Sequence, residues 1–433
     1  MGIRYGLPFP LLNPDEESIV PRAWEMAHGG DLDPEWFEYP SLLIYAIAPS
    51  QNWTDDPSFL AGRLVVLGLA LAGIAAAWWL GERAYGTVAG FVAAAVTAVY
   101  TTHVEYSRMA VTDVPLTFGV AAALLLMVMN RLPAAGVAIG VAAGFKYPAF
   151  ALLVPLVAAG WGRWRRVALS AALAPIAFAA TSPYFVVHLG EALGDVGKVQ
   201  RLGRRGWLGF EDDPAAPIAF LDRLWEGMGP ALLIAGAGLV LALAYRTHAD
   251  RILAAWVLAY FATLMPLDAH FDRYTLPLVP ALGALAGRFR SLAPVTLLLL
   301  VVPLVWTIRD TRPLVRTDTR VLAHGWIESN VTPGVLVAAD PSTAAPRSVR
   351  VLRLSLPGPG RAPDPRRDLA RLRALNVGYV LVTGAVADRV QAARERYPLE
   401  ARFYEQLRER GNRRFYRDGV GTLAGPWVAV YEL

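Results

Sequence analysis

The chain has 433 residues, of which 55 % are hydrophobic and only 18 % are charged. This composition excludes an ordinary soluble domain and predicts an integral membrane protein. The absence of cysteine excludes a disulfide scaffold and a cysteine nucleophile. The net charge of +5 rests mostly on arginines in short connections between apolar runs. Membrane topology explains those arginines better than nucleic acid, so no nucleic-acid partner is expected.

A carboxylate pair, Asp15-Glu16, stands before the first long apolar run. A carboxylate at a lipid-water boundary is the proton acceptor that a membrane transferase acting on lipid-linked substrates needs. Two solvated acids in an exposed loop are the alternative. Residues 1–57 are therefore expected to form an outer loop with interfacial helices that carries the Asp-Glu pair.

About ten apolar runs then predict a helical membrane domain over residues 58–312. Several approach the ~20 residues that a helix needs to cross a bilayer. The runs lie at residues 58–80, 86–104, 113–130, 134–146, 148–160, 167–187, 229–245, 251–267, 274–287 and 292–308.

Basic residues occupy every second connection, which the positive-inside rule assigns to the cytoplasm. They are Arg83, Arg131, Arg163, Arg165, Arg166, Arg246, Arg251, Arg288 and Arg290. The alternation requires two short segments in residues 134–160, separated at Lys146-Tyr147-Pro148, because proline disfavours helix continuation. A single helix over residues 134–160 would invert every later loop. The loop at residues 188–228, also rich in Lys and Arg, fits the outer side least well.

Residues 313–433 have a soluble pattern and predict a small α/β domain. An amphipathic helix is expected at residues 317–330 and another at 385–396, with buried strands at 334–339 and 377–383. Phe415-Tyr416 and the segment 427–431 suggest an edge hairpin. No glycine-rich phosphate loop opens any of these helices, so neither a nucleotide nor a redox cofactor is expected.

Several motifs, in this order, resemble those of one family. They are Asn13-Pro14-Asp15-Glu16, Tyr39-Pro40-Ser41-Leu42, Tyr106-Ser107-Arg108 with Thr112-Asp113-Val114-Pro115, Gly144-Phe145-Lys146-Tyr147-Pro148, and Asp272-Arg273-Tyr274-Thr275-Leu276-Pro277. They look like the polyprenyl-phosphate-sugar-dependent glycosyltransferases of the GT-C fold. These include the protein O-mannosyltransferases (glycosyltransferase family 39) and the lipid A aminoarabinose transferases.

The resemblance implies a polytopic α-helical protein of the cell membrane with a small C-terminal extracytoplasmic α/β domain. It also implies an inverting transferase that moves a sugar from a polyprenyl-phosphate donor to a hydroxyl of a protein, lipid or glycan. Family members carry a transmembrane helix before the Asp-Glu loop. Since only 14 residues precede Asp15 here, we expect either that the first family helix is missing or that the true start lies upstream of Met1.

By resemblance, Asp15 is the general base, and Glu16 orients it or helps to hold a metal. Asp113 matches the family's second acidic position, although a helix cap would also place an acid there. Arg108 is expected to pair with Asp113 or to meet the donor phosphate, and snorkelling to the interface is its alternative.

The charge of the leaving phosphate needs cations, and Lys146 and Arg273 are the candidates. Tyr147 and Tyr274, from the same two motifs, are assigned to substrate binding with them. A divalent metal ion is a candidate cofactor, with Asp15, Glu16, Asp113 and His270 as ligands, and an ordinary polar loop is the alternative for His270.

Two other classes remain open. A lipid or solute transporter would also place ions such as Lys146 and Asp113 within the membrane, but transporters usually show repeated halves and none is visible here. The second alternative is a non-catalytic protein that binds polyprenyl lipid. The residues specify neither the sugar nor the acceptor.

Overall fold

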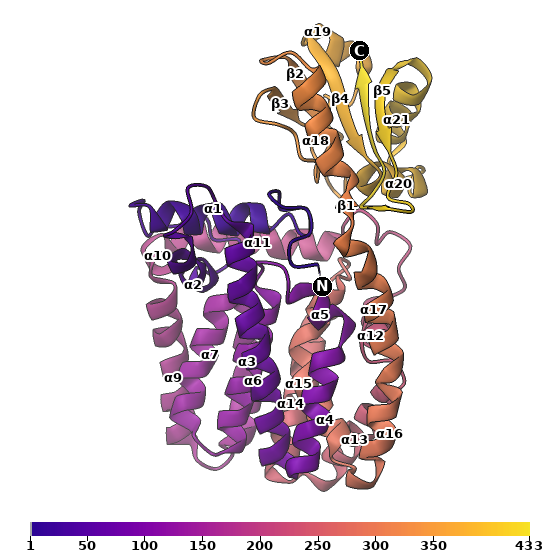
Figure 1. Cartoon of the computed structure of the whole chain (residues 1–433). Coiled ribbons are helices and arrows are strands. Elements are labelled where there is room, and N and C mark those ends of the chain that lie inside the picture. The colour runs from indigo at the N-terminus through magenta and orange to yellow at the C-terminus, as the bar shows by residue number, and fades with distance from the viewer. Residues whose placement is uncertain (1) are drawn as a thin grey trace. The chain divides into compact units, whose positions relative to one another are not determined.

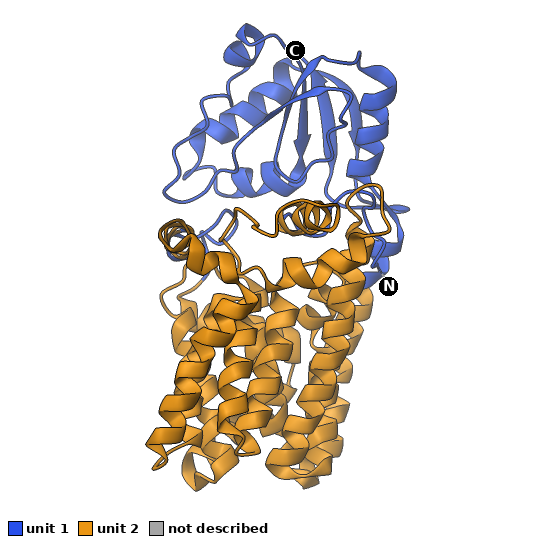
Figure 2. Cartoon of the chain, turned by 90° about the vertical axis from the view of Figure 1, so that its left-hand side faces the viewer, with its two compact units in different colours: residues 1–14, 202–213, 311–433 blue, residues 15–201, 214–310 orange. Residues whose placement is uncertain are grey.

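The computed structural model describes residues 2–433, which divide into two compact units (Figure 2). Unit 2 consists of residues 15–201 and 214–310 and is a bundle of helices. Unit 1 consists of residues 2–14, 202–213 and 311–433 and contains a β-sheet with helices. The expected combination of a helical membrane domain and a small α/β domain is confirmed.

The helices of the bundle follow the predicted apolar runs closely. In chain order they are α1 (Glu16–Ala27), α2 (Leu42–Gln51), α3 (Phe59–Tyr85), α4 (Thr87–Val99), α5 (Thr101–Tyr106), α6 (Asp113–Val128), α7 (Leu132–Phe145), η1 (Tyr147–Leu152), α8 (Leu153–Ala159), α9 (Trp164–Thr181), α10 (Pro183–Val187), α11 (Leu189–Arg205), α12 (Ala216–Met228), α13 (Ala231–Tyr245), α14 (His248–Leu264), η2 (Asp272–Leu278), α15 (Val279–Gly287), η3 (Arg290–Leu292), α16 (Ala293–Leu299) and α17 (Val301–Thr311), with η labelling 3-10 helices.

By length and hydropathy, two helical stretches within residues 2–433 qualify as membrane spans, Phe59–Tyr85 and Arg290–Val315. A third is added if α12 and α13, which meet at 119°, count as one span. The remaining apolar helices are shorter, and several of them make up the bundle together with these spans (Figure 1).

The break within residues 134–160 occurs where the sequence predicts it. Lys146 has an extended backbone with φ −159° and ψ 132°, and Pro148 has no N–H to continue the helix. The Arg163 guanidinium donates to the side chain of Asn130 at 2.9 Å, whereas the Lys146 ammonium contacts Asp113 at 2.6 Å. Residues 130 and 163 therefore share one end of the bundle and residues 113 and 146 share the other, so the two-segment hairpin is confirmed.

Small residues hold this hairpin against α9. Gly136, Gly140 and Gly144 recur every fourth residue on α7. A Cβ on these glycines would collide with the carbonyl oxygens of Ser170 and Ala174 and with the Thr181 hydroxyl, respectively. Only glycine allows helices to approach this closely, as in other membrane helix pairs.

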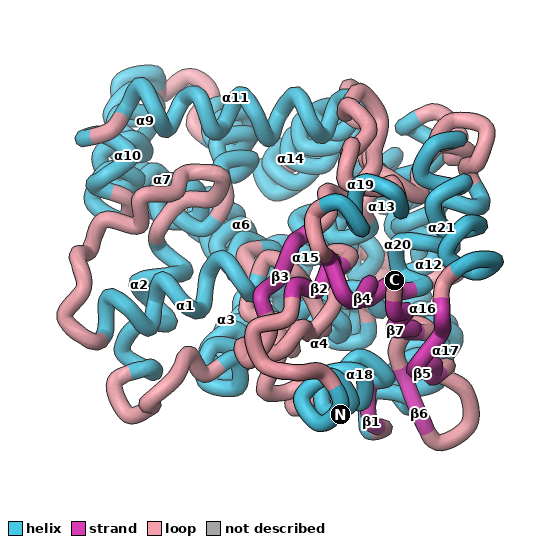
Figure 3. The backbone as a smooth tube through the Cα atoms, turned by 90° about the horizontal axis from the view of Figure 1, so that it is seen from above, coloured by secondary structure: helices cyan, strands magenta, loops and turns pink. Residues whose placement is uncertain are grey.

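Two helices of unit 2 lie flat across one end of the bundle. In Figure 3 α1 and the part of α11 at residues 189–201 are seen lengthwise, while the bundle helices are viewed nearly end-on. The helices α1 and α2 lie within residues 1–57, where interfacial helices were expected. The helix α11 was not predicted within the loop at 188–228.

Unit 1 holds a five-stranded sheet in the order β3-β2-β4-β7-β5, where β2 pairs in parallel with β3 and β4, and β7 is antiparallel to β4 and β5. Its elements are η4 (Arg312–Val315), β1 (Thr317–Asp318), α18 (Thr319–Asn330), β2 (Leu336–Ala339), β3 (Arg350–Arg353), α19 (Leu369–Ala374), β4 (Val377–Thr383), α20 (Gly384–Ala392), α21 (Pro398–Arg410), β5 (Asn412–Arg417), β6 (Leu423–Ala424) and β7 (Val428–Glu432). The predicted helices and buried strands are present, and β5 and β7 pair antiparallel where an edge hairpin was expected, although only β5 lies at the edge of the sheet. The sequence did not predict β3, α19 or α21.

Unit 1 also differs from the predicted domain of residues 313–433, because two distant segments join it. Leu208 is buried in the core of the sheet domain, and the Arg361 guanidinium lies 4.4 Å from the ring centre of Trp207. From the N-terminal segment, the Leu11 carbonyl accepts a hydrogen bond from Arg320 at 2.9 Å. Side chains far apart in sequence complete this core, and the local pattern of the chain does not show that.

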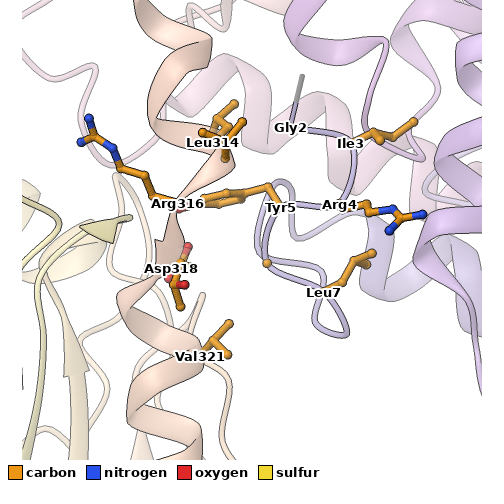
Figure 4. Close-up of a pocket in the computed structure, with 12 residues that line it drawn as sticks. Gly2, Ile3, Arg4, Tyr5, Leu7, Leu314, Arg316, Asp318 and Val321 are labelled. Carbon is orange, nitrogen blue, oxygen red and sulfur yellow. The ribbon is translucent and has the colours of Figure 1, made fainter. Parts of the chain in front are cut away.

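A pocket of about 430 Å³ lies in unit 1 between residues 2–7 and 314–321 (Figure 4). Tyr5 and Asp318 line it, and the charge of Asp318 is balanced by Arg320 at 2.7 Å. Figure 4 shows the guanidinium groups of Arg4 and Arg316 pointing away on opposite sides. They do not converge on one ligand.

The hairpin makes a prediction for single cysteines placed in this cysteine-free chain. Ser107→Cys and Gly190→Cys should react with a membrane-impermeant maleimide from one side, and Arg131→Cys and Trp161→Cys only from the other. The reason is that the connections after α6 and α8 share one end of the bundle. Labelling of positions 131 and 161 from opposite sides would contradict the hairpin.

Candidate active site

Glu16 is completely buried, and its carboxylate is fully engaged. Its oxygens accept hydrogen bonds from Arg63 Nε at 2.8 Å and Arg63 Nη2 at 2.7 Å, and from the Ala110 amide at 2.8 Å. Both side chains of the ion pair have 0 % exposure. These bonds leave no oxygen of Glu16 for a metal, whereas its expected role of orienting Asp15 stays a prediction. Glu16 fastens the start of α1 to α3 and to the loop before α6.

Asp15 lies next to this ion pair and is differently placed. It is the N-cap residue of α1, but its side chain makes no capping bond. Its carboxylate instead accepts a hydrogen bond from the Tyr39 hydroxyl at 3.0 Å and lies 4.0 Å from the Arg273 guanidinium. The side chain is 25 % exposed, so solvent or a substrate hydroxyl can reach it. This combination of fixed position and access suits a proton acceptor.

Lys146 and Asp113 form the second pair of the site. Their 2.6 Å contact joins the tip of the α7 hairpin to the start of α6, and both side chains are nearly buried. The Lys146 ammonium also lies 5.4 Å from the ring centre of Tyr39 and 5.3 Å from that of Tyr274. Arg108 was expected to pair with Asp113 or to meet the donor phosphate; the structure pairs Asp113 with Lys146, and the phosphate role of Arg108 stays a prediction. The negative charge that stabilises the charged guanidinium of Arg108 is that of Glu105.

Arg273 stands among aromatic rings. Its guanidinium carbon lies 4.3 Å from the ring centre of Phe271, 5.8 Å from that of Tyr274 and 6.0 Å from that of Tyr106. Its side chain is 14 % exposed, and its charged partner Asp15 is at the outer limit of an ion pair. Arg273 is thus held in place by ring contacts while its guanidinium fork is not saturated by a carboxylate.

A third acid, Asp272, adjoins these residues and was not among the predicted site residues. Its carboxylate accepts hydrogen bonds from the Thr102 hydroxyl at 3.3 Å, the Tyr106 hydroxyl at 3.4 Å and the Arg273 amide at 2.8 Å. Burial and the charge of Asp272 raise the pKa of nearby Glu105 to about 7. The sequence placed Asp272 in a motif, but no spacing rule links it to Tyr106.

Two predicted site residues lie apart from the charged pairs. The Tyr147 hydroxyl donates to the carbonyl of Phe37 at 2.8 Å, so Tyr147 secures the segment that carries Tyr39. His270 packs edge-on against Phe220 with ring centres 5.4 Å apart. Tyr39, which the sequence placed in one of the motifs without a role of its own, is the main site residue that sequence reasoning missed.

The four candidate metal ligands do not come together. Within residues 2–433 there is no group of three His, Cys, Asp or Glu side chains with metal-binding geometry. Glu16 is saturated by Arg63 and the Ala110 amide, and Asp113 is neutralised by Lys146. This donor set does not fit a divalent ion.

Comparison of the fold gives its class. ArnT from Cupriavidus metallidurans in the apo state superposes with a TM-score of 0.57 over 97 % of this chain and 93 % of its own, at 15 % identity. The same protein bound to undecaprenyl phosphate gives 0.55, over 96 % and 93 %, at 15 % identity. Archaeal oligosaccharyltransferase AglB from Archaeoglobus fulgidus, in complex with an inhibitory peptide and a dolichol-phosphate, gives 0.52 over 96 % and 70 %, at 12 % identity.

These structures are GT-C glycosyltransferases, so the chain has the GT-C fold, as its motifs suggested. The likeness covers both units of the chain, and within residues 2–433 two helices are long and apolar enough to cross a membrane. Another AglB structure is a complex with Zn and sulfate. No known family pattern and no curated protein matches the sequence.

The Glu16–Arg63 pair makes a stability prediction. Glu16→Gln or Arg63→Met alone should destabilise the protein by about 3–5 kcal/mol, because each leaves a buried charge or polar group without its partner. The double variant should lose less than the sum of the two. Thermal unfolding of all three variants in detergent measures this cycle.

Arg83→Gln is the matched control, since Arg83 lies on the same helix in an exposed pair with Glu82. It should change stability by less than about 1 kcal/mol. Additive losses for Glu16 and Arg63 would show that they do not act as a pair.

Proposed function

We propose that the protein is an inverting glycosyltransferase that moves a sugar from a polyprenyl-phosphate donor to an acceptor hydroxyl. The observation that carries this proposal is the arrangement of one carboxylate and two cations. The accessible carboxylate of Asp15 lies 4.0 Å from the guanidinium of Arg273, and the ammonium of Lys146 lies against the rings of Tyr39 and Tyr274. The GT-C fold supports the reaction type, and the prenyl phosphates bound by structural neighbours support the donor class.

In this reaction the acceptor oxygen attacks the anomeric carbon of the sugar, and the bond from that carbon to the phosphate oxygen breaks. The electron pair leaves with the lipid phosphate, and the configuration at the carbon inverts. Asp15 takes the proton of the acceptor hydroxyl. This step needs a carboxylate within hydrogen-bonding reach of the acceptor hydroxyl, and the Tyr39 hydroxyl already lies 3.0 Å from Asp15.

The two cations have different tasks in the proposal. Arg273 presents a planar fork whose ion-pair contact with Asp15 is as long as 4.0 Å, so it is suited to bind two phosphate oxygens. Lys146 is already paired with Asp113 at 2.6 Å and acts as a point charge on a fixed stem. Both stabilise the negative charge that grows as the phosphate leaves.

We further propose that the site faces the outer side of the membrane. The end opposite the site carries Arg163 and Arg288, with the other basic connections expected from the sequence. An excess of arginine in short loops is typical of the cytoplasmic side. Lipid-linked sugar would then be used at the extracytoplasmic face, where the acceptor is a protein, lipid or glycan hydroxyl.

Asp15→Asn tests the base. It should abolish transfer while leaving expression and binding of the donor largely intact, because it removes the proton acceptor with little change in shape. Transfer of radiolabelled sugar from undecaprenyl-phosphate mannose or aminoarabinose to envelope material in membranes measures it. Turnover close to the wild-type rate would remove Asp15 from the catalytic step.

Arg273→Lys and Lys146→Met test the phosphate contacts. Loss of the Arg273 fork or of the Lys146 charge should slow transfer from every donor by a similar factor, roughly 10²–10³ by analogy with the loss of one oxyanion donor. Lysine should replace Arg273 only in part because the planar fork is lost. Rates measured for two donors that differ in sugar distinguish the roles. A switch in sugar preference at unchanged rate would show that these residues recognise the sugar.

A further inference from the structure

The Tyr39 hydroxyl occupies the position at which an acceptor hydroxyl would meet the base. It donates to Asp15 Oδ2 at 3.0 Å, which is the hydrogen bond that an acceptor must form before it gives up its proton. Burial and the negative charge of Asp15 raise the pKa of Tyr39 well above its ordinary value. Tyr39 therefore remains protonated and is the donor of this bond.

The segment that carries Tyr39 is anchored on three sides. The Phe37 amide donates to Asp195 of α11 at 3.1 Å, and the Phe37 carbonyl accepts from Tyr147 of η1 at 2.8 Å. After Tyr39, the Ser41 amide donates to the Ser182 hydroxyl at the end of α9 at 3.2 Å. Phe37 itself is buried. The contact of Tyr39 with Asp15 thus belongs to a secured segment.

Tyr39 also faces the donor side of the site. Its ring centre lies 5.4 Å from the ammonium of Lys146, and Tyr147, the residue after Lys146, holds the Phe37 carbonyl. A phosphate drawn to Lys146 would arrive beside Tyr39. The residue consequently touches the base and adjoins a cation proposed to bind the donor.

We propose that Tyr39 is a gate on the catalytic base: its hydroxyl holds Asp15 until an acceptor hydroxyl takes that place, and so keeps a bound donor from reacting with water. The inference rests on the proposed glycosyltransferase function. The gate is needed because the Asp15 side chain is 25 % exposed, so water has access to it.

The side reaction that the gate suppresses is hydrolysis of the donor. A water oxygen bonds to the anomeric carbon, and the bond from that carbon to the phosphate oxygen breaks with its electron pair on the lipid phosphate. The proton of the water goes to Asp15. The products are free sugar and polyprenyl phosphate, and the reaction needs no other co-reactant.

Tyr39→Phe tests the gate because it keeps the ring and removes only the hydroxyl. Purified protein in lipid nanodiscs is given radiolabelled undecaprenyl-phosphate mannose or aminoarabinose, without acceptor and with envelope extract. The ratio of free sugar to transferred sugar should rise roughly tenfold, the effect expected from losing one hydrogen bond to a charged group. Tyr39→Phe combined with Asp15→Asn should abolish the hydrolysis, since the water is activated by Asp15.

Tyr45→Phe is the matched control. The Tyr45 hydroxyl donates to the carbonyl of Leu32 at 3.0 Å and so anchors the same connection between α1 and α2 without contacting Asp15. It should leave the ratio at the wild-type value.

The outcomes separate the two proposals. If the wild-type protein neither transfers nor hydrolyses these donors, the proposed function fails. If the wild-type protein transfers sugar but Tyr39→Phe leaves the ratio unchanged, or lowers hydrolysis and transfer equally, the gate is refuted and Tyr39 only positions the base. A rise in Tyr45→Phe as large as that in Tyr39→Phe would assign the effect to loosening of the segment and refute the gate as well.

Discussion

The buried pair of Glu16 and Arg63 is the constraint on which the site depends. Removing two charges from water is costly, and such a pair is tolerated only where the geometry is nearly ideal and further hydrogen bonds satisfy the carboxylate. Both conditions hold here, with two parallel contacts to Arg63 and a third from the Ala110 amide. The start of α1 therefore has one position relative to α3 and the loop before α6.

Asp15 derives its position from this pair because it directly precedes Glu16 in the chain. Of two adjacent acids, one is sealed inside the bundle and the other projects to a surface that a substrate can reach. Their environments, and not their residue types, separate the two tasks. A fixed but accessible carboxylate is what proton transfer requires, since a mobile one would spend little time in reach of the acceptor.

The two cations of the site are unevenly paired with carboxylates. Lys146 is satisfied by Asp113, while Arg273 keeps its fork among aromatic rings with Asp15 at the limit of contact. A second negative group, such as a lipid phosphate, would therefore find one cation ready and a second nearby. The glycines of α7 support this arrangement because close packing on α9 fixes the hairpin that ends at Lys146.

The sequence by itself determined the class of protein, because apolar runs and the alternation of arginines depend only on local composition and on the membrane. It also determined the break before Pro148 and the buried strand β4, which has the predicted bounds. The partners of the site residues were decided only by the tertiary structure. Glu16 and Arg63 are 47 residues apart and Lys146 and Asp113 are 33 apart, and no periodicity relates them. Tertiary packing selects which distant side chains meet, and it joins residues 202–213 to unit 1 through Trp207 and Leu208 in the core of the sheet domain.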